Sequence, residues 1–496
     1  MTSALDRLSY GFAKSRGVLF RGGETPAFVL KRGGDRLALI EARRAVGRTW
    51  PVEEVDAPQF ERALSDIYAF SDAEAGSLGD QAEGESLSSI IDEIPPTADL
   101  LDSASDAPII RLINGLIAEA IRTAASDIHV EPYEDRVSVR YRIDGVLSER
   151  ASLAPALASP LVSRIKVMSR LDIAEKRVPQ DGRLSLNLGG KGVDVRVATL
   201  PSRFGERVVL RLLDKDQARF TLDQLGMGPA NLADMKQALG QPNGIILVTG
   251  PTGAGKTTTL YAALNLLNDS SRNILTVEDP VEYALDGVGQ TQVNAKVGMT
   301  FSAGLRAILR QDPDVVMVGE IRDVETAGIA VQASLTGHLV LSTVHTNSAV
   351  AAVARLRDMG VESFLLATTL SAIVAQRLVR RLCGHCRESY TASAAERSAM
   401  GLASSGPVAL YRSRGCPACK GLGYAGRVGL YEVVTVDEGL RALIHDHASE
   451  KALSDHAFRN RKHLFQDGVS AALNGETSLS EVLRVCREEG ERHAGV

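Results

Sequence analysis

Apolar positions recur with two different periods along this chain, and their spacing divides it into regions with different expected structure. Four short runs between residues 226 and 382 are almost continuously apolar, at 245–249, 274–277, 315–319 and 339–344. Continuous runs of this length are typical of strands buried on both faces of a parallel sheet. Polar residues follow each run directly, and open parallel sheets bind ligands beyond the carboxyl ends of their strands. The pattern therefore predicts an α/β domain whose four strand ends meet at one site.

A region before it, residues 107–225, mixes helical and alternating periods and is expected to form a separate domain. Apolar residues recur at helical spacing from Ile109 to Ile121, and residues 127–131 and 137–143 then alternate with period two. The turn between the alternating segments predicts a hairpin that sets an acidic face against a basic one. The charged side chains suit cross-strand ion pairs, and a metal site on the first strand is the alternative. These side chains are Asp127, His129 and Glu131 on the first strand and Arg140 and Arg142 on the second.

The flanking regions are predicted from composition and shorter patterns. Residues 1–70 are expected to form a small α/β docking domain, with strands at 28–30 and 37–40 around a Lys-Arg-Gly-Gly-Asp turn. Residues 71–106 carry ten Asp or Glu and no Lys or Arg, which is typical of a flexible acidic linker, although a solvated face of an ordered domain has the same composition. Residues 421–496 are expected to be helical.

A glycine-rich segment follows the first apolar run and matches the phosphate-binding pattern G-x-x-x-x-G-K-T. The run before it suits a strand and residues 258–264 after it suit a helix, which is the context that the pattern requires. Glycines let backbone N–H groups turn inward around a β-phosphate, and the helix N-terminus adds partial positive charge. Lys256 is expected to contact the β- and γ-phosphates, and the Thr257 hydroxyl to bind Mg²⁺. The predicted nucleotide-contacting residues are Gly250, Pro251, Thr252, Gly253, Ala254, Gly255, Lys256, Thr257 and Thr258.

An acidic residue at the end of the third run is the candidate ligand for Mg²⁺. Glu320 follows this run, and Mg²⁺ prefers oxygen ligands, so Glu320 is expected to bind the ion directly or through water. Asp314 precedes the same run. At roughly 3.3 Å per residue it lies about 20 Å away, at the wrong end of the strand, and is therefore rejected.

The other two strand ends carry candidates for catalysis. Glu278 ends the second run and is expected to orient the attacking water, with Asp279 and Glu282 helping to hold the site. His345 ends the fourth run and His338 precedes it. Both are candidates to sense the γ-phosphate, and an ordinary structural histidine is the alternative for each.

Four of the five cysteines form two C-x-x-C pairs, at Cys383 and Cys386 and at Cys416 and Cys419. Two such pairs supply the four thiolates of a tetrahedral Zn²⁺ site, and a closed site of four thiolates is structural. The alternative is four unrelated thiols. Cys486 remains as an ordinary free thiol. The sequence therefore predicts a zinc element over residues 383–420.

Bulk properties narrow the class of protein. The chain has 496 residues and a net charge of −5, with an isoelectric point near 6.1. No apolar run reaches the roughly 18 residues of a membrane-spanning helix, and the N-terminus lacks the apolar centre of a signal peptide. The chain is therefore expected to be cytoplasmic, and its acidic character argues against nucleic acid as a partner.

Three segments at the strand ends resemble a known family. Residues 278–282 (Glu-Asp-Pro-Val-Glu), 319–323 (Gly-Glu-Ile-Arg-Asp) and 336–347 look like the aspartate box, Walker B motif and histidine box of the secretion ATPases, the motors of type II secretion and type IV pili. The resemblance implies a RecA-like P-loop NTPase core preceded by a mixed α/β, PAS-like domain, with ATP and Mg²⁺ as cofactors. In this family two arginines of the preceding domain reach the γ-phosphate, and Arg196 and Arg211 match them.

Within this family the chain is most similar to the assembly ATPases of type II secretion. The cysteine element argues against the retraction motors, which lack it, and residues 10–19 look like the N-terminal module of secretion ATPases. The resemblance implies a homohexamer, peripheral on the cytoplasmic face of the bacterial inner membrane, which docks on platform proteins through residues 1–106. A type IV pilus extension ATPase is the alternative. A RecA-like nucleic-acid translocase and a nucleotide-binding scaffold without turnover are alternatives of other classes.

Overall fold

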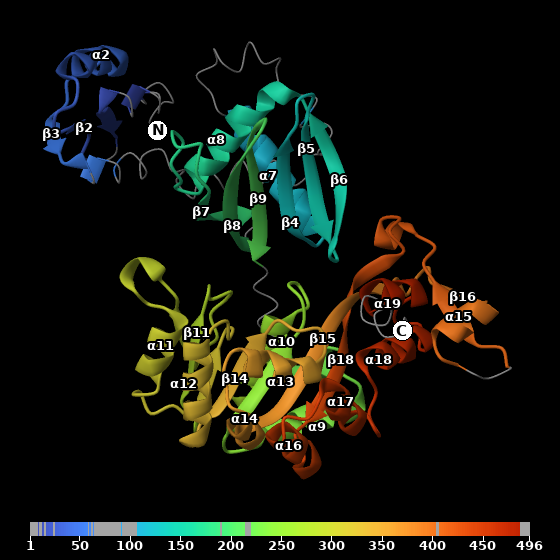
Figure 1. The fold of residues 1–496 in the computed structure, drawn as a ribbon. Coiled ribbons are helices and arrows are strands. Elements are labelled where there is room, and N and C mark those ends of the chain that lie inside the picture. The colour runs from blue at the N-terminus through green and yellow to red at the C-terminus, as the bar shows by residue number, and fades with distance from the viewer. Residues whose placement is uncertain are drawn as a thin grey trace. The chain divides into compact units, whose positions relative to one another are not determined.

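Two compact units make up the chain, Met1–Asp214 and Lys215–Val496 (Figure 1). In this computed structural model no helix of the described residues is long and apolar enough to cross a membrane. The structure describes Leu8 and residues 12–13, 16–22, 25–57, 59–60, 63, 91, 107–188, 191–213, 220–402 and 406–486.

The first unit begins with a three-stranded sheet of order β1-β2-β3, in which β1 is antiparallel and β3 parallel to β2. The strand predicted over residues 37–40 is wrong, because these residues belong to helix α2. Asp35 caps this helix by accepting the Leu37 N–H at 2.9 Å. Ala38 and Ala42 face the core four residues apart, so helical periodicity outweighs the short apolar run. The elements are β1 Val18–Arg21, β2 Ala27–Lys31, α2 Arg36–Val46 and β3 Val52–Val55.

Residues 107–213 form a six-stranded antiparallel sheet of order β6-β5-β4-β9-β8-β7. Helices α7 and α8 pack their apolar faces on the sheet and complete one hydrophobic core. The predicted helix before the hairpin and the hairpin itself are confirmed as α7, β4 and β5. The elements are α7 Ala107–Arg122, β4 Ala125–Pro132, β5 Val137–Ile143, β6 Val146–Leu153, α8 Ala158–Met168, β7 Gln180–Leu188, β8 Lys191–Ser202 and β9 Gly205–Leu213.

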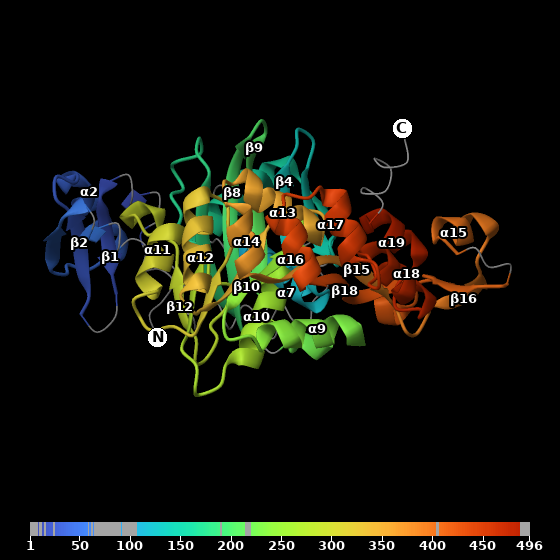
Figure 2. The same cartoon turned by 60° about the horizontal axis from the view of Figure 1, so that its bottom comes forward.

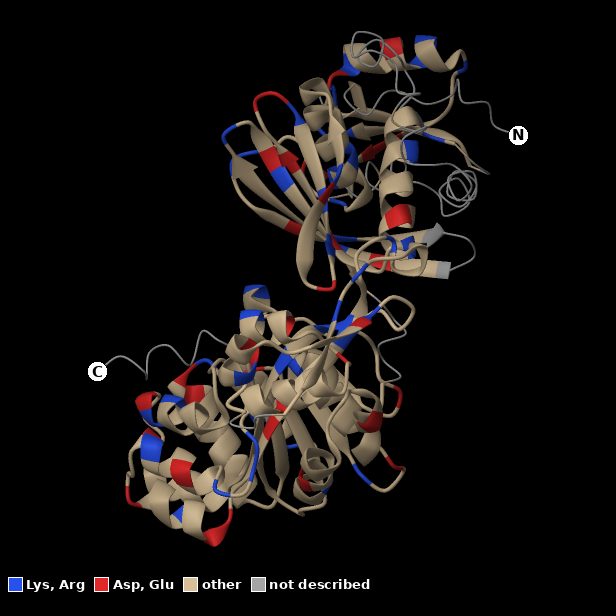
Figure 3. Cartoon of the chain, turned by 90° about the vertical axis from the view of Figure 1, so that its right-hand side faces the viewer, with Lys and Arg blue, Asp and Glu red and all other residues tan. Residues whose placement is uncertain are grey.

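Charged side chains lie side by side on the strands of this sheet (Figure 3). Glu131 Oε1 pairs with Arg140 Nη2 at 2.6 Å, and Asp127 Oδ2 lies 3.7 Å from Arg142 Nε. The cross-strand ion pairs predicted from the sequence are therefore confirmed. Among the described residues, the group of side chains arranged to hold a metal is the set of four cysteines and not the acidic face of β4.

The second unit is built on a seven-stranded sheet of order β12-β11-β13-β14-β10-β15-β18, parallel except for β18. The four predicted strands are confirmed as β10, β11, β13 and β14, and they are neighbours in the sheet. Their carboxyl ends therefore lie at one edge. The strands are β10 Gly244–Thr249, β11 Ile274–Glu278, β12 Gly289–Gln292, β13 Val315–Val318, β14 Leu339–Val344, β15 Leu370–Leu382 and β18 Tyr424–Thr435.

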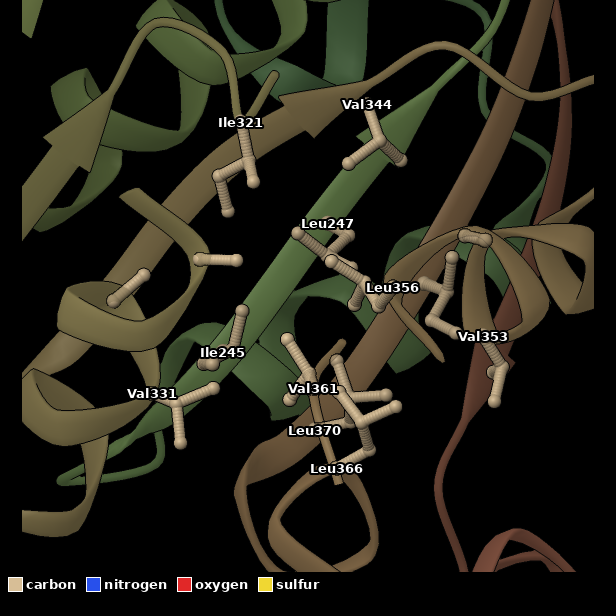
Figure 4. Close-up of a cluster of buried hydrophobic side chains, with 14 of the residues drawn as sticks. Ile245, Leu247, Ile321, Val331, Val344, Val353, Leu356, Val361, Leu366 and Leu370 are labelled. Carbon is tan, nitrogen blue, oxygen red and sulfur yellow. The ribbon is translucent and has the colours of Figure 1, made fainter. Parts of the chain in front are cut away.

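Helices cover both faces of this sheet, with α9 and α10 on one side and α12 and α14 on the other (Figure 2). Alternate residues of β10 enter the two cores, and Figure 4 shows Ile245 and Leu247 clustered with Val331 and Leu356. Burial on both faces explains why these strands are continuously apolar. The helices are α9 Pro229–Leu239, α10 Lys256–Leu267, α11 Phe301–Ile308, α12 Val324–Leu335, α13 Ala349–Asp358 and α14 Ser363–Thr369.

The expectation that residues 421–496 are helical is wrong in its first part. Residues Tyr424–Thr435 form β18, which pairs antiparallel with β15 from Ala372↔Thr435 onward. Burial of β18 on both faces removes the alternation that marks a strand exposed on one side. The remaining segment is helical as predicted, with α16 Glu438–His445, α17 Glu450–Ala457, α18 Leu464–Leu473 and α19 Leu479–Cys486. The cysteine segment contains β16 Glu388–Thr391, α15 Ala394–Ala399 and β17 Ala409–Arg412.

Candidate nucleotide-binding and metal sites

The loop between β10 and α10 has the backbone that a phosphate cradle needs. Gly253 and Gly255 have φ values of 81° and 85°, in the left-handed region that favours glycine. A Cβ at Gly250 would lie 2.6 Å from the Gln376 carbonyl oxygen on neighbouring β15, so only glycine fits there. Helix α10 begins at Lys256, and the N–H groups of a first helical turn lack intrahelical acceptors. The loop can therefore hold an anion at the N-terminus of α10.

Lys256 is folded back onto this loop. Its ammonium donates to the carbonyl oxygens of Gly250 and Pro251 at 2.8 and 3.2 Å. Burial lowers the pKa of Lys256 to about 8, against the opposing effect of the Glu320 carboxylate. Phosphate oxygens would replace the two carbonyl oxygens without a large movement of the side chain.

The ends of β13 and β14 meet the same ammonium. His345 Nδ1 lies 3.5 Å from Lys256 Nζ, and His345 Nε2 lies 3.5 Å from Glu320 Oε2. Arg322 pairs with the other Glu320 oxygen. Burial lowers the pKa of His345, and the Lys256 charge lowers it further, which favours the neutral imidazole at pH 7. The predicted meeting of strand ends is therefore confirmed, with Lys256, His345 and Glu320 in one cluster.

The first turn of α10 completes the set of oxygen donors that Mg²⁺ would use. Thr257, next to Lys256, is exposed, and Thr258 is half-buried. Glu320 presents a carboxylate at the end of β13 with its side chain 12% exposed. A hydroxyl and a carboxylate with room for water suit Mg²⁺, which keeps several of its waters.

Two residues near the strands lie at the opposite edge of the sheet. Asp314 Oδ2 accepts the N–H of Asn273 at 2.7 Å, just before β11 begins, which confirms its rejection as a metal ligand. His338 precedes β14, and its carbonyl oxygen accepts the N–H of Gly244 at the start of β10. The candidate role of His338 at the γ-phosphate is therefore wrong, because β14 separates it from the phosphate loop.

Glu278 is more enclosed than the sequence suggests. Its residue is 3% exposed, and burial raises its pKa. Oε1 accepts from Thr276 Oγ1 at 2.6 Å and from Gln290 Nε2 at 3.1 Å, and Oε2 accepts from the Tyr261 hydroxyl. Glu282, four residues later in the same loop, is only half-buried. The network around Glu278 joins α10, β11 and β12, so this carboxylate has a clear positioning role.

Sequence reasoning missed several residues that hold the loop. Thr249 Oγ1 accepts the N–H of Thr346 at 2.8 Å, which ties the end of β10 to the histidine box. Gln376 on β15 donates from its amide to Ala254 O at 2.6 Å, and Arg377 donates to Asn347 O at 3.0 Å. None of these positions belongs to a catalytic motif. The one usable signal was polar residues inside the apolar segment that forms β15.

The two predicted arginines belong to the first unit. Arg196 on β8 and Arg211 on β9 are directly opposite each other in the sheet register, as expected for neighbouring strands. Arg211 Nε donates to Asp127 Oδ1 at 3.0 Å. Their role at the γ-phosphate stays a prediction.

The four cysteines come together as predicted. The Sγ distances are 3.9 Å for Cys383–Cys416 and 3.7 Å for Cys386–Cys419 and Cys416–Cys419. Four thiolates about 2.3 Å from one Zn²⁺ would lie roughly 3.8 Å apart, so the set fits the ion. Burial raises the pKa of Cys419, but the backbone N–H groups of Cys416 and Gly423, both at 3.2 Å, hold it at about 6. The cluster lies outside the strand-end site and suits a structural metal.

A parallel sheet with a phosphate loop after one strand and an acid at the end of another defines a P-loop NTPase. Comparison with known proteins places the chain within that class. The profile of the family described as "Type II/IV secretion system protein" matches residues 102–484, and that of an N-terminal domain of "GSPII protein E" matches residues 7–68. The chain therefore belongs to the type II/IV secretion system protein family.

Similar proteins agree with this assignment. "Type II secretion system protein E" of Pseudomonas aeruginosa is 55% identical over 485 residues, 97% of each chain. "Type II secretion system ATPase E" of Vibrio cholerae is 54% identical over 453 residues, 91% of this chain and 90% of that protein. Among solved structures, the ADP-bound pilus retraction motor PilT is 26% identical, with a TM-score of 0.52 over 74% of this chain and 95% of that one. The Legionella pneumophila ATPase DotB shares the fold, with a TM-score of 0.56, 20% identity and coverage of 75% and 94%.

The purified chain should contain stoichiometric zinc, measured by elemental analysis. Structural zinc contributes about 10–16 kcal/mol in small zinc domains, so Cys416→Ser should unfold the element over residues 383–420. Nucleotide binding should persist, because the phosphate loop is held by other strands. Zinc-free protein with four reactive native thiols would contradict the site. Loss of nucleotide binding in a folded Cys416→Ser protein would contradict its independence.

Nucleotide affinity should fall as pH rises through about 8. The Lys256 ammonium is lost above that pH in the free protein, whereas bound phosphates favour the charged form, so binding must take up a proton. Calorimetry in buffers of different ionisation enthalpy should show this uptake above about pH 8, with affinity falling up to about tenfold per pH unit. The dependence should disappear in Lys256→Ala. A pH-independent affinity in the unaltered protein would show that Lys256 stays charged.

Proposed function

We propose that this chain is the ATP-hydrolysing motor of a type II secretion system, where it drives pseudopilus assembly and protein export. One observation carries the proposal: Lys256, Glu320 and His345, from three strand ends, converge at one edge of the sheet. The chain that contains this cluster is 55% identical over 97% of its length to a type II secretion system protein E. Bound Mg²⁺ would neutralise charge developing on the phosphates, and Thr257 and Glu320 are the residues to hold it.

The acids of the aspartate box divide two tasks in this proposal. Glu278 accepts three hydrogen bonds and is almost fully buried, which supports a positioning role rather than direct contact with water. Glu282 follows in the loop beyond β11, and its charge is near enough to raise the pKa of Glu278. We therefore assign the attacking water to Glu282 and the fixing of its loop to Glu278. This assignment revises the role expected for Glu278 from the sequence.

Arg196 and Arg211 are proposed to reach the γ-phosphate when the two units close on a nucleotide. Their positions opposite each other on β8 and β9 would present two guanidinium groups together. Arg211 already binds the carboxylate of Asp127, and a phosphate oxygen is a comparable acceptor for the same donors. Hydrolysis would remove this acceptor and release the closed state.

The proposed assembly is a homohexamer on the cytoplasmic face of the inner membrane, docked on platform proteins through residues 1–106. Helix α2 supports docking because Leu37 and Ile40 are 73% and 54% exposed on it. Arg36 and Arg44 lie on the same helix and are also exposed. Exposed apolar residues flanked by charge are typical of a protein interface.

Three substitutions should separate binding from chemistry. Lys256→Ala should weaken ATP binding. Glu282→Gln should bind ATP with near-normal affinity and turn over orders of magnitude more slowly, with unchanged thermal stability. Glu278→Gln should lower both turnover and stability, because it disturbs the buried network. Steady-state turnover, equilibrium binding and thermal unfolding measure these effects. Normal turnover in Glu282→Gln together with a stable, inactive Glu278→Gln would return the water to Glu278.

Arg196→Ala and Arg211→Ala should each lower turnover with little change in ATP affinity. A single arginine finger contributes about 10³–10⁵ in rate in GTPases, and two arginines sharing the charge should each contribute less. Arg150→Ala, on β6 of the same sheet, is the matched control and should leave turnover unchanged. Loss of affinity with unchanged turnover would remove both arginines from the proposed role.

A further inference from the structure

A buried carboxylate outside the nucleotide site joins two helices of the second unit. Glu432 lies on β18 and is 3% exposed. Its Oε1 accepts the N–H of Ala349, the first residue of α13, at 2.9 Å. Its Oε2 accepts the N–H of Leu464, the first residue of α18, at 3.1 Å. One carboxylate therefore caps the N-termini of two helices that are far apart in sequence.

The two helix N-termini explain how this charge is kept in the interior. Removing a carboxylate from water costs several kcal/mol unless it is hydrogen-bonded and its charge is offset. The positive ends of α13 and α18 both face Glu432, and each offers a first-turn N–H that has no intrahelical acceptor. A neutral glutamine of the same shape would keep the packing but lose this attraction.

Helix α13 begins directly after the histidine box, so the cap is connected to the phosphate loop. Thr249, which precedes the loop, accepts the N–H of Thr346 at 2.8 Å. Thr346 Oγ1 in turn donates to the carbonyl oxygen of Ser348 at 3.0 Å. Ser348 is the N-cap residue of α13 and precedes Ala349, whose N–H reaches Glu432. An unbroken path of hydrogen bonds and peptide bonds thus leads from the phosphate loop to α18.

We propose that Glu432 is a positioning residue that couples the nucleotide site to the C-terminal helices. It fixes the start of α13, and through it the loop that carries His345, against α18. A shift of the histidine box on nucleotide binding is then transmitted to α18, which packs in one hydrophobic core with α19 and the strand after the cysteines. This inference rests on the proposed function only for its kinetic readout, because coupling to bound nucleotide is measured without turnover.

The test uses the full chain with Glu432→Gln, with and without Mg²⁺ and ADP. Hydrogen exchange should show that nucleotide slows exchange in the first turn of α18 of the unaltered protein and has no such effect in the variant. In ATP turnover, the variant should keep KM within about threefold and lose about tenfold in kcat.

Glu481→Gln is the matched control. Glu481 is also buried, at 2% exposure, but it pairs with the side chains of Arg380 and Arg484 and not with a helix next to the site. This variant should lower the unfolding temperature while keeping kcat within about twofold and the exchange response of α18. Equal losses in both variants, or an unchanged response in Glu432→Gln, would overturn the coupling.

A second variant covers the case in which Glu432→Gln fails to fold. Ala349→Pro removes only the N–H that Oε1 accepts, and proline fits the first position of a helix. Ser348 before it is extended, with φ −126° and ψ 163°, which proline tolerates in its predecessor. The proline variant should also lose the exchange response of α18, and a retained response would overturn the proposal. Absence of turnover in the unaltered chain would instead contradict the proposed function alone.

Discussion

The parallel pairing of β11, β13, β14 and β10 is the constraint on which the rest of the structure depends. Parallel strands point the same way, so every residue that follows a strand is delivered to one edge of the sheet. The phosphate loop, Glu320 and His345 meet there although they lie far apart along the chain. Strand registers such as Val248↔Thr343 fix these ends to within a residue. Asp314 and His338, at the starts of the strands, are excluded from the site by the same rule.

Buried charge is the second organising feature, and each instance has its own compensation. Lys256 is held by two loop carbonyl oxygens, and its lowered pKa records the cost of burial. Glu278 accepts from three side-chain donors, and Glu432 from two helix N-termini. Hydrogen bonds to charged groups contribute about 1.5–3 kcal/mol each, so two or three offset an effective desolvation cost of several kcal/mol. These groups are therefore rigid, which suits the alignment of phosphates, metal and water.

Much of this arrangement follows from the sequence, and the exceptions have physical causes. The strand ends and the cysteine cluster were predictable because parallel sheets and tetrahedral zinc impose local spacing rules. Strand β18 was missed because burial on both faces removes alternation, and α2 because four apolar residues in a row are compatible with either element. The enclosure of Glu278 depends on Tyr261 and Gln290, which only the folded chain brings to it. Glu432 was invisible for the same reason, since its partners are 83 and 32 residues away.

The central claim is that four strand ends form one nucleotide site, and an experimental structure with Mg²⁺ and a non-hydrolysable ATP analogue tests it most directly. The account predicts phosphate oxygens within hydrogen-bonding distance of Lys256 Nζ, in place of its bonds to Gly250 and Pro251. It also predicts a metal bound by Thr257, with Glu320 in direct contact or one water away. Phosphates seated outside residues 250–258, or a metal remote from Glu320, would contradict the account.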